Sequence, residues 1–192
     1  MSAGSGGSRE SRVRGAFAAF ALALTFASAP ALTREAGIAP ALEIGGERVT
    51  PAHLTLADLS KLPRVRVHAS AHGEEADWDG VPLIELLESS GAPVGDALRG
   101  PALALYVRVT AVDGYRAVFA LAEIDPSTGN AQAILADRKN SQPIDDREGP
   151  LRLIVPGDKR PARWVRQVVA IDLISAPDSH APARMAAPDS EK

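Results

Sequence analysis

The feature of this 192-residue sequence that most constrains its fold is a hairpin signal at Asp113-Gly114. Two apolar runs flank this dipeptide, LALYVRVTAV before it and YRAVFAL after it. An Asp-Gly pair adopts the positive φ angles that a two-residue turn between antiparallel strands requires. The sequence therefore predicts a β-hairpin in the middle of the chain.

Further short strands surround this hairpin. A strand, a Gly-Gly turn and a second strand are predicted for ALEIGGERVT, and single strands are predicted for AQAILAD, PLRLIVP and VRQVVAIDLI. The segment RVRVHAS alternates, which places Val65 and Val67 on one face and Arg64, Arg66 and His68 on the other. Many short strands of this kind indicate a protein built mainly from β-structure.

Two helices are predicted between these strands. In TLADLSKL, Thr55 is a suitable N-cap and Pro63 ends the segment. In GVPLIELLESSG, Leu83, Leu86 and Leu87 form one apolar stripe, and Gly91 lies just beyond the end. We therefore expect an α+β fold, mostly β.

The sequence predicts one folded domain, residues 41–175, and no internal repeat. Residues 1–31 combine arginines, a short apolar run and small residues, as a cleavable secretory signal does, with an uncleaved anchor or an organelle transit peptide as alternatives. Residues 32–40 are expected to be a linker, and residues 176–192 a disordered tail. We expect a periplasmic or secreted protein with no stable membrane span after cleavage, since the apolar run is shorter than the roughly 20 residues of a spanning helix.

Composition excludes several kinds of function. The net charge is −3 and the sequence pI about 5.8, so nucleic acid is not an expected partner. Cysteine is absent, which excludes disulfides, thiolate metal sites and cysteine nucleophiles from this chain. No Gly-x-Ser-x-Gly elbow and no glycine-rich phosphate loop is found.

Positive charge is concentrated in the segment from residue 149 to residue 174. Lys159, Arg160, Arg163 and Arg166 lie between two apolar runs, and Arg152 lies just upstream. Guanidinium groups bind phosphate and sulfate through paired hydrogen bonds, so this segment is a candidate anion site. A solvated turn without a ligand explains the same pattern, and both interpretations stay open at this point.

Histidine spacing offers a second candidate site. His68 and His72 are four residues apart, with Glu74, Glu75 and Asp77 nearby. On a strand, however, such positions lie about 13 Å apart, too far to share one ion. We therefore expect no metal site here.

The order of several segments resembles the molybdopterin-binding domain of the sulfite oxidase family. These segments are DWDGVPLIELLESSGAP, VTAVDGYRAVFALAEI, ILADRKNSQPI and REGPLRLIVPGDKRPARWVRQVVAIDL. The family pattern contains W-x-G-V-P-L before a helix, then D-G-Y, then G-x-P-x-R-L-x-V-P-G and a basic stretch. The resemblance covers about residues 41–175 and implies the sulfite-oxidase-type fold, with the cofactor held among loops.

The resemblance also implies where a cofactor would bind. Active members bind molybdenum through a pterin dithiolene and one cysteine, which stands shortly before the tryptophan of W-x-G-V-P-L. The best-placed residues here are His68 to Ser70. Arg163 and Arg166 match the basic cofactor contacts, but Pro161 stands where the family has glycine, and one extra residue precedes it.

We therefore identify Arg163, Arg166, Arg66 and His68 as candidate ligand-binding residues, and no catalytic or metal-binding residue. The expected function is that of an exported anion-binding or accessory module without molybdenum catalysis, with a small anionic ligand or a periplasmic partner protein. Molybdopterin stays open as a cofactor through the resemblance alone. The alternative is an active molybdopterin-dependent oxidoreductase that lacks a protein thiolate ligand. The arginines of the N-terminal segment read RVR, without the adjacent pair of a twin-arginine signal.

Overall fold

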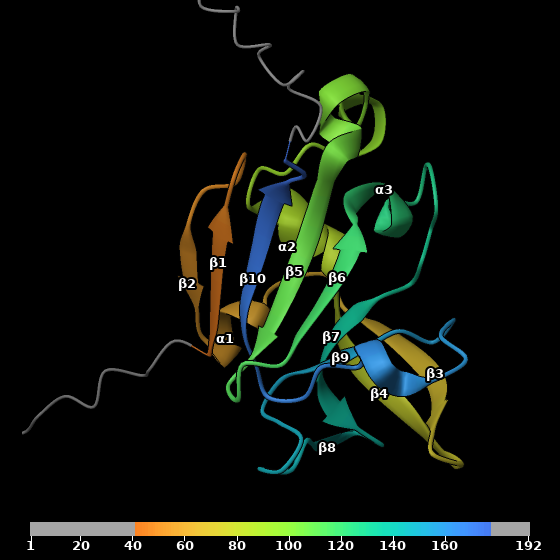
Figure 1. Cartoon of the computed structure of the whole chain (residues 1–192). Coiled ribbons are helices and arrows are strands. Elements are labelled where there is room, and N and C mark those ends of the chain that lie inside the picture. Colours follow the sequence, from red (N-terminus) through yellow and green to blue (C-terminus); the bar gives the residue numbers. More distant parts are fainter. Residues whose placement is uncertain (1–40, 178–192) are drawn as a thin grey trace, which may run out of the picture. The chain divides into compact units, whose positions relative to one another are not determined.

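The computed structural model describes residues 41–177, which form two β-sheets joined by short helices and loops (Figure 1). The predicted signal, linker and nearly all of the predicted tail lie outside these residues. Within residues 41–177, no helix is long and apolar enough to cross a membrane.

The first sheet has the strand order β2-β1-β10-β5-β6. Its strands are β1 (Leu42–Gly46), β2 (Ala52–Leu54), β5 (Leu105–Ala111), β6 (Arg116–Ala120) and β10 (Val168–Ser175). Strand β1 runs parallel to β10, whereas the other neighbouring pairs are antiparallel. The first and the last strand of the described residues thus pair with each other.

The second sheet has the order β3-β4-β7-β8, with β9 also paired to β7. Its strands are β3 (Val65–Ala71), β4 (Glu74–Pro82), β7 (Ile134–Lys139), β8 (Gln142–Pro143) and β9 (Arg152–Ile154). Strand β3 lies at the edge of this sheet, and Val65 is 40% exposed. The alternating pattern predicts that the valine face of this strand is covered. Val65 is instead exposed at the sheet edge.

The predicted hairpin is confirmed, since strands β5 and β6 pair in antiparallel register. Its turn is not the expected two-residue turn: the Gly114 N–H donates to the Ala111 carbonyl, so Val112 and Asp113 are the central residues. Gly114 follows them with a φ of 84°, whereas Asp113 does not have a positive φ. The backbone N–H of Tyr115 donates to Oδ1 of Asp113 at 2.9 Å, a turn contact that aspartate makes readily. The turn lies beside the segment that precedes β10, because the N–H of Val112 donates to the carbonyl of Gln167.

Both predicted helices are present. Helix α1 (Leu56–Leu59) begins with a capping box, in which the Thr55 hydroxyl accepts from the N–H of Asp58. Helix α2 (Leu83–Ser89) buries the predicted leucine stripe and is followed by Gly91 at a φ of 97°. Helix α3 (Leu121–Ile124) and three 3₁₀ turns, η1 (Gly95–Ala97), η2 (Gly100–Ala104) and η3 (Pro161–Arg163), complete the fold.

The residues from Trp78 to Pro82 have distinct structural roles. Trp78 and Val81 are buried in the core, and Pro82 leads into α2. Gly80 lies so close to β7 that an added Cβ would stand 2.2 Å from the Leu135 carbonyl oxygen. A side chain larger than hydrogen would therefore separate β4 from β7.

One continuous hydrophobic core includes side chains from both sheets and from α2. Leu86 of α2, Val107 of β5 and Leu173 of β10 are all fully buried within it, and α2 is seen behind β10 and β5 in Figure 1. Because strands dominate and the helices are short, the expected α+β, mostly β class is confirmed.

Candidate functional site

A cavity of about 700 Å³ lies among segments from both sheets. Such a volume suits a small-molecule ligand. Its walls come from the turn after β3, the β5–β6 hairpin, the loop before β9, β9 itself and the segment before β10. The lining residues are His72, Ala111, Asp113, Tyr115, Arg147, Glu148, Arg152, Arg160, Pro161, Ala162, Trp164, Arg166 and Gln167.

The charge of this cavity is positive. Four arginines line it against the two carboxylates of Asp113 and Glu148, a net charge of +2 when His72 is neutral. Arg147, Arg160 and Arg166 are exposed, and none of them forms a salt bridge with a residue in the described range 41–177. Their guanidiniums are therefore available to an anion that enters the cavity.

The fourth arginine, Arg152, is buried. It is 5% exposed, and its Nη1 donates to the carboxylate of Glu148. The Cζ atom lies 5.0 Å from the ring centre of Trp78 and 5.8 Å from that of Trp164. The two indole rings meet edge to face at 6.3 Å, so they hold the cation in a rigid aromatic setting.

Hydrogen bonds fix the wall formed by η3 and the residues after it. The Tyr115 hydroxyl donates to the Ala162 carbonyl at 2.6 Å and so joins the β5–β6 hairpin to η3. The Trp164 indole N–H donates to the Val155 carbonyl at 3.0 Å. The first contact joins residues 47 positions apart, and the second joins the residue after η3 to the residue after β9, so both tie this wall to neighbouring segments.

Of the four candidate residues named from the sequence, Arg166 lines this cavity and Arg163 does not. Arg163 lines a second cavity of about 390 Å³. Its guanidinium donates to Asp158 at 2.6 and 3.0 Å and to Glu123 at 2.9 Å, and it stacks 4.4 Å from the centre of the Phe119 ring. The hydrogen bonds to Asp158 raise the pKa of Arg163 further above its usual range.

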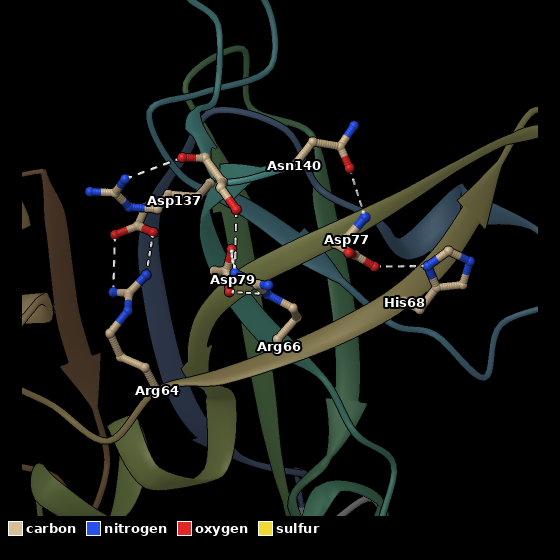
Figure 2. A network of polar contacts seen from close by, with 9 residues as sticks. Arg64, Arg66, His68, Asp77, Asp79, Asp137 and Asn140 are labelled. Atoms are coloured by element: carbon tan, nitrogen blue, oxygen red, sulfur yellow. Dashed lines mark hydrogen bonds and ion pairs between the residues drawn. The ribbon is translucent and has the colours of Figure 1, made fainter.

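Arg66 and His68 lie on the edge strand β3 and line neither cavity. Figure 2 shows them facing acids of the neighbouring strand: Arg66 donates to Asp79 at 2.7 Å, and His68 Nδ1 lies 2.9 Å from Asp77. The hydrogen bond with Asp77 raises the pKa of His68. Arg64 bonds Asp137 of β7 in the same way. The cationic face of β3, formed by Arg64, Arg66 and His68, is therefore paired with acids. It lines neither the cavity of Arg166 nor that of Arg163.

Of the other cavity residues, Arg152 and Arg160 belong to the basic segment identified from the sequence, whereas Arg147 and Tyr115 were not identified. The sequence marks Arg152 as unusual, because a charged residue within the apolar run LRLIV is expected to be buried and therefore to have an ionic partner or a ligand. The cavity as a whole brings together residues up to 95 positions apart in the chain, from His72 to Gln167, which a local pattern does not show.

The residues present do not fit a molybdenum ion held by a protein thiolate. Residues 68–70, the best-placed for that ligand, contain no sulfur, and the His68 side chain is 64% exposed in contact with Asp77 and Glu75. Across residues 41–177, no cluster of three or more His, Cys, Asp or Glu side chains is arranged to hold a metal ion. Imidazole is a neutral ligand and does not replace the charge of a thiolate.

Comparison with known proteins places the chain in a family. The model of the oxidoreductase molybdopterin binding domain matches residues 38–181. No curated protein matches the chain. Among solved structures, the sulfane dehydrogenase SoxCD from Paracoccus pantotrophus is similar, with a TM-score of 0.56 and 19% sequence identity over 70% of this chain.

The chain spans 38% of the length of that SoxCD chain, and the likeness shows a shared fold. It confirms the sulfite-oxidase-type architecture expected from the order of the sequence segments. Together with the match of the family model over most of the chain, it shows that this protein belongs to the oxidoreductase molybdopterin binding domain family, which is related to sulfite oxidase.

Proposed function

We propose that this protein binds a small anionic ligand in the arginine-lined cavity and performs no molybdenum catalysis. The observation that carries the proposal is the presence of Arg147, Arg160 and Arg166 around one cavity without acidic partners among the described residues. A protein of net charge −3 that keeps three unpaired guanidiniums around one cavity has a local preference for anions.

The expected affinity is modest and sensitive to salt. A charge-assisted hydrogen bond contributes about 1.5–3 kcal/mol when it is protected from water. The three unpaired arginines are exposed, so each contributes less than that. Screening by added salt weakens such contacts strongly, because the Debye length at physiological ionic strength is about 8 Å.

The absence of a suitable metal ligand supports the second part of the proposal. The chain contains no cysteine, and the residue nearest the thiolate position, His68, is engaged with Asp77 on an open sheet edge. The alternative of an active molybdopterin-dependent oxidoreductase is supported by family membership and not by a donor group in residues 41–177.

Calorimetric titration tests the binding. Sulfate, phosphate and a pterin phosphate are titrated into the wild type and into a double variant, Arg160→Gln with Arg166→Gln. The control is Arg99→Gln with Arg116→Gln, which removes the same charge from exposed positions that do not line the cavity. Salt-sensitive binding that the cavity variant loses and the control retains supports the site, whereas equal binding in all three proteins refutes it.

We also propose that the protein is exported and acts in the periplasm or outside the cell, alone or as an accessory to a partner protein. The support is the arrangement of arginines, apolar run and small residues over residues 1–31. Mass spectrometry of the native protein is expected to find a chain that begins near Leu32. An intact N-terminus in the membrane fraction would contradict the proposal.

A further inference from the structure

An ion pair lies inside the arginine-lined cavity. Both Glu148 and Arg152 line it, and among residues 41–177 the Glu148 carboxylate is the only acid that forms a salt bridge with Arg152. The two side chains differ in burial: that of Arg152 is 7% exposed and that of Glu148 is 27% exposed. A buried cation thus depends on a counter-ion that is itself within reach of solvent and of any ligand.

The Arg152 guanidinium has unused hydrogen-bonding capacity. It carries five N–H donors, and within the described part of the chain it makes one hydrogen bond, to Glu148. Its Nε is fully buried and has no partner. The Trp78 and Trp164 rings attract the cation but do not accept conventional hydrogen bonds from it. A buried donor without an acceptor is costly, so an additional acceptor beside Arg152 would be favourable.

We propose that Glu148 acts as a built-in competitor of the ligand for Arg152. In the structure its carboxylate holds the guanidinium, and the oxyanion of a ligand competes with that carboxylate for the same cation. This inference rests on the proposed function, because it concerns the same cavity. It assigns Arg152 as the anchor of the site and Glu148 as the residue that keeps its affinity low.

The proposal also specifies the chemical class of the ligand. Four guanidiniums line the cavity, those of Arg147, Arg152, Arg160 and Arg166. A phosphate or sulfate group offers at least three acceptor oxygens pointing in different directions, whereas a carboxylate offers two in one plane. The ligand therefore carries a tetrahedral oxyanion, as a free ion or as the ester of an organic molecule.

Neutralising Glu148 has two expected effects. It raises the net charge of the lining from +2 to +3 and releases the Arg152 guanidinium, so an oxyanion binds more tightly. It also leaves a buried cation without its counter-ion, which destabilises the fold until an anion replaces the carboxylate. A counter-ion with a purely structural role would show the second effect without rescue by the anion.

The experiment uses the full chain and measures calorimetric affinity and thermal unfolding at constant ionic strength. The probes are inorganic sulfate, inorganic phosphate and glycerol phosphate, which distinguish a free ion from an ester. The variant is Glu148→Gln, and Glu88→Gln on the exposed side of α2 is the matched control. We expect the Kd for sulfate or phosphate to fall about tenfold in Glu148→Gln, with a lower Tm that sulfate restores. The control is expected to behave as the wild type.

A second variant covers the case in which Glu148→Gln does not fold. The double variant Glu148→Gln with Arg152→Met removes both partners, so the net charge of the lining stays at +2. Replacing a buried pair by uncharged side chains of similar size is often neutral for stability. We expect the Tm of this protein to stay near that of the wild type, and its oxyanion affinity to fall about tenfold.

The outcomes separate this inference from the proposed function. If the double variant binds sulfate and phosphate as the wild type does, while the Arg160 and Arg166 variant does not, Arg152 is not the anchor and the inference is wrong. Weaker binding in Glu148→Gln than in the wild type would also overturn it. If the wild type binds none of the three probes, both the inference and the proposed function are refuted.

Discussion

Arg163 and Arg166 lie three positions apart, yet the structure predicts opposite effects when each is replaced by alanine. Arg163 holds Asp158 through two hydrogen bonds and Glu123 through a third, and it stacks on Phe119. Arg166 is exposed at the cavity. We therefore expect Arg163→Ala to reduce stability and keep anion binding, and Arg166→Ala to reduce anion binding and keep stability.

The magnitude for Arg163 follows from its contacts. Three charge-assisted hydrogen bonds of about 1.5–3 kcal/mol each would be a large sum if they were buried. The Arg163 side chain is 35% exposed and that of Glu123 is 36% exposed, so solvent screening reduces each contribution well below that range. A total loss of about 2–3 kcal/mol remains, including a cation–π contact of about 0.5–1 kcal/mol.

Thermal and urea unfolding measure this loss. A loss of 2–3 kcal/mol corresponds to a fall in Tm of about 6–12 °C in a domain of this size. Arg163→Lys keeps the charge but not the paired hydrogen bonds, so we expect it to recover part of the stability. An unchanged Tm in Arg163→Ala, combined with loss of sulfate binding, would refute this assignment and return Arg163 to the binding site.

Two further predictions concern the second sheet. Because the hydrogen bond with Asp77 raises the pKa of His68, this pair stabilises the fold fully below the unfolded-state pKa of about 6.5, and the contribution is lost as pH rises through the higher folded-state value. NMR titration is expected to show a lower His68 pKa in Asp77→Asn, and no change there would contradict the assignment. Gly80→Ala should cost about 2–3 kcal/mol, because the added methyl group meets the Leu135 backbone. Gly157→Ala, which meets no atom within 4 Å, is the control, and equal unfolding midpoints for both variants would show that β4 and β7 tolerate a side chain between them.

Local signals account for the parts of the fold that were predicted correctly. The hairpin at Asp113-Gly114, the Thr55 capping box and the leucine stripe of α2 each depend on residues within one short segment. Helix α3 was missed because it has four residues and no side-chain cap, and β8 was missed because it has two residues. Elements this short carry too few residues for a periodic pattern.

The candidate site was predicted only in part. Arg166 was named as a candidate because it belongs to the basic segment. Arg163 belongs to the same segment, but it lies in the η3 turn and lines a different cavity. The pairing of β3 with acids was within reach of the sequence: a turn at His72-Gly73 places Asp79 opposite Arg66 and Asp77 opposite His68. The cavity itself requires the tertiary fold, because its arginines all lie within residues 147–166, whereas its remaining walls include His72 after β3 and Asp113 and Tyr115 of the β5–β6 hairpin.

The central claim is that this member of the molybdopterin binding domain family uses its arginine-lined cavity without molybdenum chemistry. Elemental and pterin analysis of protein purified from its native host tests that claim most directly. Because the chain has no cysteine to hold the metal, we expect molybdenum to be absent or far below one atom per chain. About one molybdenum per chain, with a bound pterin, would contradict the claim and establish the protein as an oxidoreductase.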